Sequence, residues 1–209
     1  MNPPQKRRTS DVIRDFFLAH EDGEFVVAPR DLPFQVIGAS REPSWVLVVT
    51  KVQSMMPHLV DRSQKTPEHF SVVGRGGLPN PWDAAWLAEW IGERPACFLG
   101  DLDPVDLLVY AWLRRRVDGA LNFVGISDHL LFRMGLRCSD VPSLECSPAE
   151  KKALPLMKRM VGEASDRIGP ECLKLLESGR KIELEAFLGM VDTREEGFLY
   201  QVFGHHFPR

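Results

Sequence analysis

The sequence is poor in cysteine, and its few cysteines do not form a metal-binding or redox pattern. Four cysteines occur in 209 residues, at positions 97, 138, 146 and 172. No two of them form the C-x2-C pair of structural zinc sites and thioredoxin-type motifs. Cys97 lies in an apolar segment and is interpreted as a core residue. We therefore expect a cytoplasmic protein with reduced thiols.

The chain also lacks long apolar runs and an excess of positive charge. Residues 1–10 are polar, and no stretch reaches the length of a membrane-spanning helix, so we expect no membrane partner. The formal net charge is −3 and the pI is about 6.1. No protein-wide basic field exists, so any nucleic-acid binding would need a local patch. With 44% hydrophobic residues, the chain can still bury a substantial core.

Three widespread active-site motifs are absent. The glycine-rich segment 74–77 is not followed by Gly-Lys-Ser/Thr, so it is not a Walker A loop. The dinucleotide fingerprint G-x-G-x-x-G and the hydrolase elbow G-x-S-x-G do not occur either. These absences argue against a P-loop nucleotidase, a Rossmann dehydrogenase and a serine hydrolase of the α/β type.

The sequence does contain an alternation of apolar runs and helical segments. Strands are predicted at 45–50, 70–73, 96–100 and 120–124, with helices near 54–62, from Pro81, and at 104–116. Such a βαβ series predicts an α/β fold with an open, mainly parallel sheet of about four strands flanked by helices. After a surface loop at 138–148, further helices are predicted at 148–161, 170–178 and 182–191.

Three parts of the chain follow from this pattern. Residues 1–44 are predicted to be an N-terminal extension with a helix at about 10–20 and short strands. Residues 45–191 are predicted to form the main domain with its helical C-terminal part, and residues 192–209 a tail. No internal repeat or low-complexity tract divides the chain further.

Two carboxylates follow the third predicted strand, where open α/β sheets bind ligands. Asp101 and Asp103 are two residues apart, and Asp106 falls in the first turn of the next helix. Carboxylates this close repel each other unless a cation or proton neutralises them, and Mg²⁺ prefers oxygen ligands. The pair is therefore a candidate magnesium and phosphate site, with Asp106 as a further candidate. The alternative is that Asp101 caps the helix and the other two are favourable first-turn charges.

Other candidate ligand-binding residues follow the remaining strands. They are Thr50 and Lys51 after the first strand, Gly74, Arg75, Gly76 and Gly77 after the second, and Asp128 after the fourth. Glycine amides and the charges of Lys51 and Arg75 suit a phosphate. The alternative for 74–77 is a tight turn, and Ser127 with Asp128 also fits a helix start.

In order and spacing, several of these segments resemble the Toprim domain of topoisomerase VI A-subunits and meiotic double-strand-break proteins. The matching segments are 48–51, 74–79, 100–104, 123–128 and 179–186, and the resemblance as a whole covers roughly residues 45–190. The resemblance implies a Toprim-like fold, Mg²⁺ held by Asp101 and Asp103, and a role in DNA processing. It also implies DNA as a ligand and a protein partner that supplies DNA-binding or catalytic groups.

The chain departs from that family at two positions. Toprim enzymes carry a glutamate at the end of the first strand, where this sequence has Thr50. The topoisomerase subunit also uses a tyrosine on a separate winged-helix domain, and residues 1–44 are too short for one. Tyr110 lies inside a predicted core helix, and Tyr200 lies near the C-terminus. Strand cleavage through a tyrosine ester is therefore not expected of this chain alone.

Three hypotheses remain open at the sequence level. The first is a degenerate Toprim-like module that binds Mg²⁺ and a phosphate-bearing ligand or DNA. The second is an active metal-dependent nuclease that recruits another carboxylate, such as Glu183, Glu185 or Asp128, or one from a second subunit. The third is a non-catalytic interaction domain in which the aspartates only start a helix. A homo-oligomer is compatible with the tryptophan stripe at positions 82, 86 and 90.

Overall fold

A computed structural model describes residues 34–38, 45–51, 54, 70–75, 78–118, 121–161 and 165–191. The predicted helix at 10–20 and the tail at 192–209 lie outside these residues. So does the helix predicted at 54–62, apart from Ser54, which is helical. The three-part division of the chain stays a prediction.

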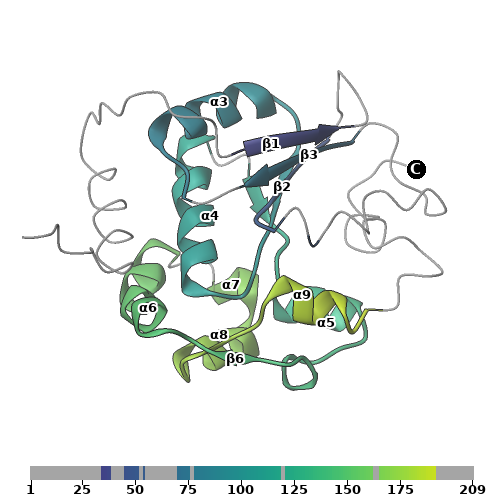
Figure 1. Cartoon of the computed structure of the whole chain (residues 1–209), viewed down its shortest axis with the longest axis vertical. Coiled ribbons are helices and arrows are strands. Elements are labelled where there is room, and N and C mark those ends of the chain that lie inside the picture. Colours follow the sequence, from purple (N-terminus) through teal and green to yellow (C-terminus); the bar gives the residue numbers. More distant parts are fainter. Residues whose placement is uncertain are drawn as a thin grey trace, which may run out of the picture.

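The centre of the molecule is a five-stranded sheet (Figure 1). Its strands are β1 (Phe34–Gly38), β2 (Trp45–Val49), β3 (Phe70–Arg75), β4 (Ala96–Leu99) and β5 (Leu121–Phe123), in the spatial order β1-β3-β2-β4-β5. Strands β3, β2, β4 and β5 are parallel, and β1 pairs antiparallel with β3 at the edge. The predicted α/β class with a mainly parallel sheet is confirmed, and the arrangement is consistent with a Toprim-like fold.

Apolar runs explain why these segments form the interior strands. Val46 to Val49 in β2 and all of β4 are buried, which fits strands covered on both faces. Helices α3 (Pro81–Ile91) and α4 (Pro104–Arg116) form the crossovers that parallel pairing requires. In α4 almost every residue from Pro104 to Leu113 is buried, so this helix is the central element of the core.

The order of the strands creates one switch point. From β2 the chain moves to β3 on one side, and it then returns past β2 to form β4 and β5 on the other side. Ligand sites in such sheets lie beyond the carboxyl ends of the two strands that flank the reversal. Here those strands are β2 and β4, so the residues after Val49 and Leu99 line the expected crevice.

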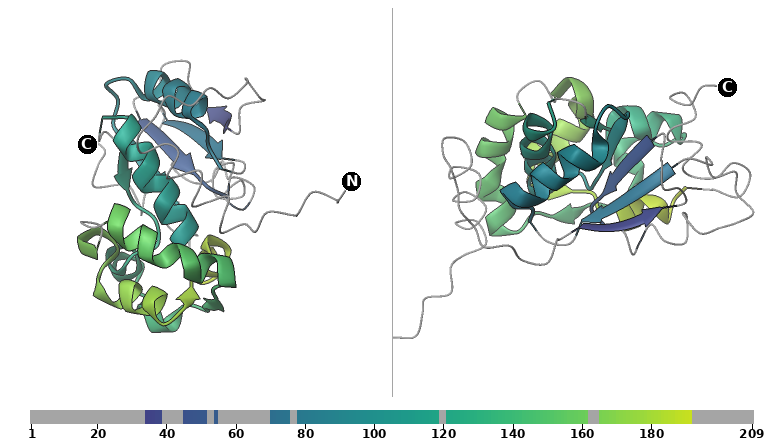
Figure 2. Two further views of the ribbon diagram at one scale, coloured as in Figure 1. Left: turned by 90° about the vertical axis from the view of Figure 1, so that its left-hand side faces the viewer. Right: turned by 90° about the horizontal axis from the view of Figure 1, so that it is seen from above.

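A second layer of helices and short strands lies beyond this carboxyl edge (Figures 1 and 2). It consists of α5 (Asp128–Arg133), the 3-10 turn η1 (Cys138–Asp140), β6 (Leu144–Glu145), α6 (Pro148–Met160), α7 (Ser165–Ile168), α8 (Pro170–Glu177), β7 (Arg180–Lys181) and α9 (Leu184–Leu188). An antiparallel bridge between Leu102 and Ile182 connects this layer to the loop after β4. The C-terminal part therefore covers the end of the sheet where a ligand is expected.

Two sequence predictions in this layer were wrong in detail. The segment 138–148, predicted as a loop, contains η1 and β6, and β6 pairs with β7. The helix predicted at 182–191 is confined to Leu184–Leu188, because Ile182 forms the bridge to Leu102 and cannot be helical. Both differences come from strand pairing between segments that are far apart in the sequence. Among the described residues, no helix has the length and apolar character needed to cross a membrane.

Candidate functional site

The loop after β4 brings three buried carboxylates together. Asp101, Asp103 and Asp106 are each no more than 7% exposed. One carboxylate oxygen from each residue lies within 4.8 Å of the other two. Among the described residues this is the one group of three potential ligands close enough to hold a metal ion. The structure thus joins the predicted pair with Asp106 at the switch point.

Local helix-start chemistry explains two of the three positions. The N-cap of α4 is Asp103, whose Oδ1 accepts hydrogen bonds from the amides of Val105 (2.7 Å) and Asp106 (2.8 Å). Pro104 occupies the first helical position, where its missing N–H costs nothing. The alternative in which Asp101 caps this helix is therefore wrong, because the extended residue directly before the proline is Asp103.

Asp106 closes the loop back onto Asp101. Its Oδ2 accepts a hydrogen bond from the Asp101 amide at 3.0 Å. Gly100 makes this approach possible: a Cβ there would lie 2.9 Å from Asp106 Oδ2 and 2.7 Å from the ring of Phe98. A side chain at position 100 would push the carboxylate or the ring away. The Gly-Asp-x-Asp-Pro sequence therefore specifies the loop as well as the charges.

Asp101 serves a purpose outside the helix start. Its Oδ1 accepts the amide of Leu184 (2.7 Å) at the beginning of α9, and its Oδ2 lies 3.0 Å from Lys51 Nζ. This side chain therefore connects three separate segments: the end of β2, the loop after β4 and the start of α9. Helix capping alone would require none of these contacts.

Crowding and burial raise the pKa values of two of the aspartates. Desolvation, followed by the charge of Asp106, raises the pKa of Asp101 to about 6, although the Leu184 amide and Lys51 oppose the shift. Desolvation and Asp106 likewise raise the pKa of Asp103 to about 7. In both cases the negative form is disfavoured, so added positive charge at this cluster would be stabilising.

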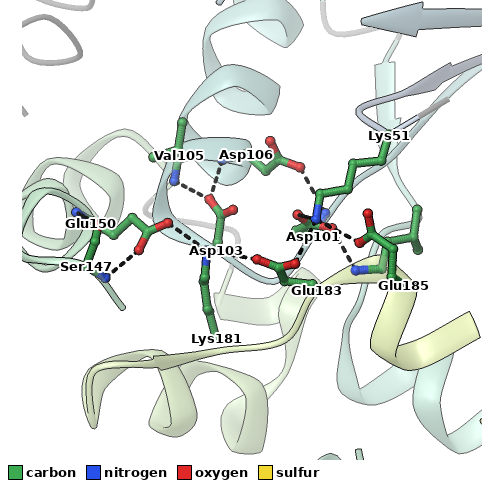
Figure 3. A network of polar contacts seen from close by, with 11 residues as sticks. Lys51, Asp101, Asp103, Val105, Asp106, Ser147, Glu150, Lys181, Glu183 and Glu185 are labelled. Atoms are coloured by element: carbon green, nitrogen blue, oxygen red, sulfur yellow. Dashed lines mark hydrogen bonds and ion pairs between the residues drawn. The ribbon is translucent and has the colours of Figure 1, made fainter. Parts of the chain in front are cut away.

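Lys51 lies in the middle of a second set of carboxylates (Figure 3). Its Nζ is 3.0 Å from Asp101 Oδ2, 3.1 Å from Glu183 Oε2 and 2.7 Å from Glu185 Oε2. Burial by itself would lower the pKa of Lys51, but hydrogen bonds to Glu185, Asp101 and Glu183 raise it above the usual lysine value. Lys51 is therefore a cation at neutral pH and cannot act as a general base.

A second lysine extends the network on the other side of the aspartates (Figure 3). Lys181 Nζ in β7 lies 2.8 Å from Glu150 Oε1 and 3.2 Å from Glu183 Oε1. Glu150 also completes the capping box of α6, since its Oε2 accepts the Ser147 amide at 2.6 Å. The positive charge of Lys181 acts on Asp103 and counteracts part of the rise in its pKa.

The donor set fits a hard divalent cation. Mg²⁺ is commonly bound through one or two carboxylates with waters and substrate phosphates, and the cluster offers three carboxylates. Thr50, directly after β2, has a buried hydroxyl oxygen without a hydrogen-bond partner, and a Cβ at Gly100 would lie 3.3 Å from its methyl group. If Mg²⁺ binds, Asp101, Asp103 and Asp106 are the residues that would hold it, and it would supply a Lewis acid for phosphate oxygens.

The remaining predicted site residues have different positions. Gly74 and Arg75 are the last residues of β3, paired with Gln35 and Phe34, so this half of the predicted loop is strand. Gly76 and Gly77 lie outside the described residues. Asp128 belongs to a different place: its carboxylate accepts the amides of Glu171 and Cys172 at the start of α8, beside Gly169. It is not part of the aspartate cluster.

Two residues of the network, Lys181 and Glu150, were not anticipated from the sequence. The segment Lys181-Ile-Glu183 contains a usable signal, because alternate polar residues share one side of an extended chain. Glu183 and Glu185 were expected as recruits for a metal, whereas both contact Lys51. No protein-family profile matches the chain, and no curated protein shows significant sequence similarity to it.

Proposed function

We propose that this chain is a degenerate Toprim-like module, related to topoisomerase VI A-subunits, that binds Mg²⁺ and a phosphate-bearing ligand such as DNA. The observation that carries the proposal is the buried cluster of Asp101, Asp103 and Asp106 at the switch point between β2 and β4. Three carboxylates within 4.8 Å repel each other, and a divalent cation relieves that repulsion. The module acts within a larger DNA-processing system whose other subunits recognise DNA.

Two lysines beside the aspartates, each also paired with glutamates, are the groups that would contact a phosphate-bearing ligand at the proposed metal. Lys51 and Lys181 flank the aspartates, so cationic groups stand close to the proposed Mg²⁺. Mg²⁺ in proteins commonly shares its ligands between one or two carboxylates and the phosphates of a substrate. A phosphodiester that contacts both the metal and a lysine would satisfy this arrangement.

Binding without catalysis fits the residues at the end of β2. A phosphoryl-transfer enzyme needs a group that moves a proton, and this strand is followed by Thr50 and by Lys51, whose raised pKa keeps it charged at neutral pH. One observation favours the second candidate, an active Mn²⁺- or Mg²⁺-dependent nuclease: Asp106 adds a third carboxylate to the pair. Plasmid DNA incubated with Mn²⁺ separates the two, since the binding module leaves it intact.

Thermal unfolding in a series of Mg²⁺ or Mn²⁺ concentrations tests the proposal. At a cation concentration ten times the dissociation constant, mass action adds about 1.4 kcal/mol, which raises Tm by roughly 3–6 °C. Asp103→Asn retains an N-cap residue, so it folds but loses most of this increase in Tm. Asp83→Asn is the matched control, because Asp83 is a buried carboxylate in the first turn of α3.

Two results would contradict the proposal. One is a wild-type Tm that does not change in millimolar cation. The other is an equal rise in Tm for Asp103→Asn and the wild type, which would place the cation elsewhere. Nicking of plasmid DNA that Asp103→Asn abolishes would instead support the nuclease.

The compartment and assembly belong to the same proposal. All four cysteines are unpaired, including Cys138 and Cys172, whose sulfur atoms are 3.9 Å apart. Free thiols at this distance support a reducing environment such as the cytoplasm. A homo-oligomer through α3 is supported by Trp82, which is 53% exposed.

A further inference from the structure

We propose that Lys51 is a built-in competitor of the divalent cation, so that its ammonium group holds Asp101 until a metal ion displaces it. This inference rests on the proposed function, because it concerns the regulation of the same site. It assigns to Lys51 a task different from direct phosphate binding. It also explains how the protein keeps a crowded carboxylate cluster folded when no metal is bound.

The geometry around Lys51 is that of a bound cation. Three carboxylate oxygens from Asp101, Glu183 and Glu185 lie within 2.7–3.1 Å of Nζ. These residues come from two distant segments, the loop after β4 and the start of α9. Ser54 Oγ donates to Glu185 Oε1 at 2.8 Å and fixes that carboxylate on the side of β2. The ammonium thus neutralises three carboxylates that would otherwise repel one another.

Asp101 is the residue that the two cations would share. Its Oδ2 contacts Lys51 Nζ at 3.0 Å, while its carboxylate also belongs to the cluster with Asp103 and Asp106. Two positive charges bound to the same carboxylate repel each other, and the low exposure of Asp101 (3%) reduces screening by water. Metal binding at Asp101 therefore works against the Lys51 contact.

Lys51 can remain paired with two other carboxylates when a metal ion binds Asp101. Glu183 and Glu185 are both more exposed than Asp101, with side chains 30% and 45% accessible. The lysine side chain is flexible and can remain on these two glutamates while it releases Asp101. Displacement thus needs a rotation of one side chain and no movement of the sheet or α9.

A Mn²⁺ titration tests the competition between the metal ion and Lys51. Binding is measured as the decrease in the electron paramagnetic resonance signal of free Mn²⁺. The variants are Lys51→Met, which removes the ammonium, and Lys158→Met, which removes a lysine paired with Glu177 on the surface. We expect Lys51→Met to bind Mn²⁺ at least about tenfold more tightly than the wild type, since one opposing charge is gone. Lys158→Met should bind with the wild-type affinity.

The outcomes separate this inference from the proposed function. Equal or weaker Mn²⁺ binding by Lys51→Met, with clear binding by the wild type, overturns the competition and leaves the metal site intact. Absence of binding by the wild type and both variants overturns the proposed function itself. An equal gain in Lys158→Met also overturns the inference, because it would reflect net charge alone.

A second variant keeps the test decisive if Lys51→Met does not fold. Lys51→Gln keeps a hydrogen-bond donor for the carboxylates without the charge, and it should show the same gain in affinity. If either variant unfolds in chelator, Mn²⁺ must restore its circular dichroism spectrum, because the metal then replaces the missing cation. Failure of Mn²⁺ to restore the fold overturns the inference.

Discussion

Helices α3 and α4 begin in the same way, yet their starts are used differently. Each follows a parallel strand, has a polar N-cap (Asn80 or Asp103), and has proline at the first helical position. Each also carries a buried aspartate at the third position. In α3, the Asp83 carboxylate accepts the Asn80 amide at 2.6 Å and completes a capping box. In α4, the Asp106 carboxylate accepts the Asp101 amide instead.

The comparison shows which residues at the start of α4 are not needed to cap the helix. Asn80 and Asp83 satisfy the first amides of α3 with one ionisable group. The α4 start contains three, and Asp101 contributes nothing to the cap but contacts Lys51 and Leu184. A helix start alone does not need that third carboxylate. The proposed cation-binding role would account for it.

The largest expected effect is on the free energy of unfolding, and it differs between a buried tryptophan of α4 and an exposed tryptophan of α3. Trp112 in α4 is 1% exposed, whereas Trp82 in α3 is 53% exposed. Trp112→Ala should lower the free energy of unfolding by about 3–5 kcal/mol through lost burial and a cavity. Trp82→Ala should change it by about 0.5 kcal/mol. Urea unfolding of both variants measures this, and equal losses would contradict the central position of α4.

The smallest expected effect is the contribution of Asp83, at the start of α3, to the pH dependence of protein stability. Desolvation raises the pKa of Asp83 in the folded protein, against an opposing hydrogen bond from the Asn80 amide. A raised folded pKa means that the stabilising contribution is complete below the unfolded pKa of about 3.9. This contribution is lost as pH rises through the folded pKa, because the buried carboxylate must then carry its charge.

Asp83→Asn should remove this contribution to the pH dependence. Urea unfolding at several pH values above about 3.9 should show that the wild type loses more stability with rising pH than the variant does. Identical pH profiles would mean that burial does not perturb Asp83. The α3 start would then give no reference for the crowded start of α4.

Local signals explain which parts of the fold were predictable. The bounds of α4 agree with the prediction because Pro104 marks its beginning and three arginines mark its end. The strands β2 and β4 were predicted within one residue because continuous apolar runs of this length suit buried parallel strands. The position of Asp101 and Asp103 beyond the carboxyl end of β4 followed from the predicted strand, and their role as ligands stays a prediction.

The parts that were missed depend on contacts between distant segments. Lys51 is hydrogen-bonded to Glu183 and Glu185, which lie more than 130 residues away in the sequence, and no local sequence pattern predicts such a contact. The bridge between Leu102 and Ile182 takes the first residue of the predicted helix 182–191, so α9 begins only at Leu184. Asp128 illustrates the opposite error, since its position after β5 suggested a ligand, whereas its carboxylate caps α8.

A crystal structure grown with Mn²⁺, with the manganese located by its anomalous scattering, tests the central claim most directly. We predict an anomalous peak within bonding distance of Asp101, Asp103 and Asp106, with Lys51 withdrawn from Asp101 and still on Glu183 or Glu185. Absence of a peak at this cluster, with Lys51 Nζ still on Asp101 Oδ2 in saturating Mn²⁺, would contradict it. The aspartates would then be a buried salt-bridge network that joins α9 to the sheet.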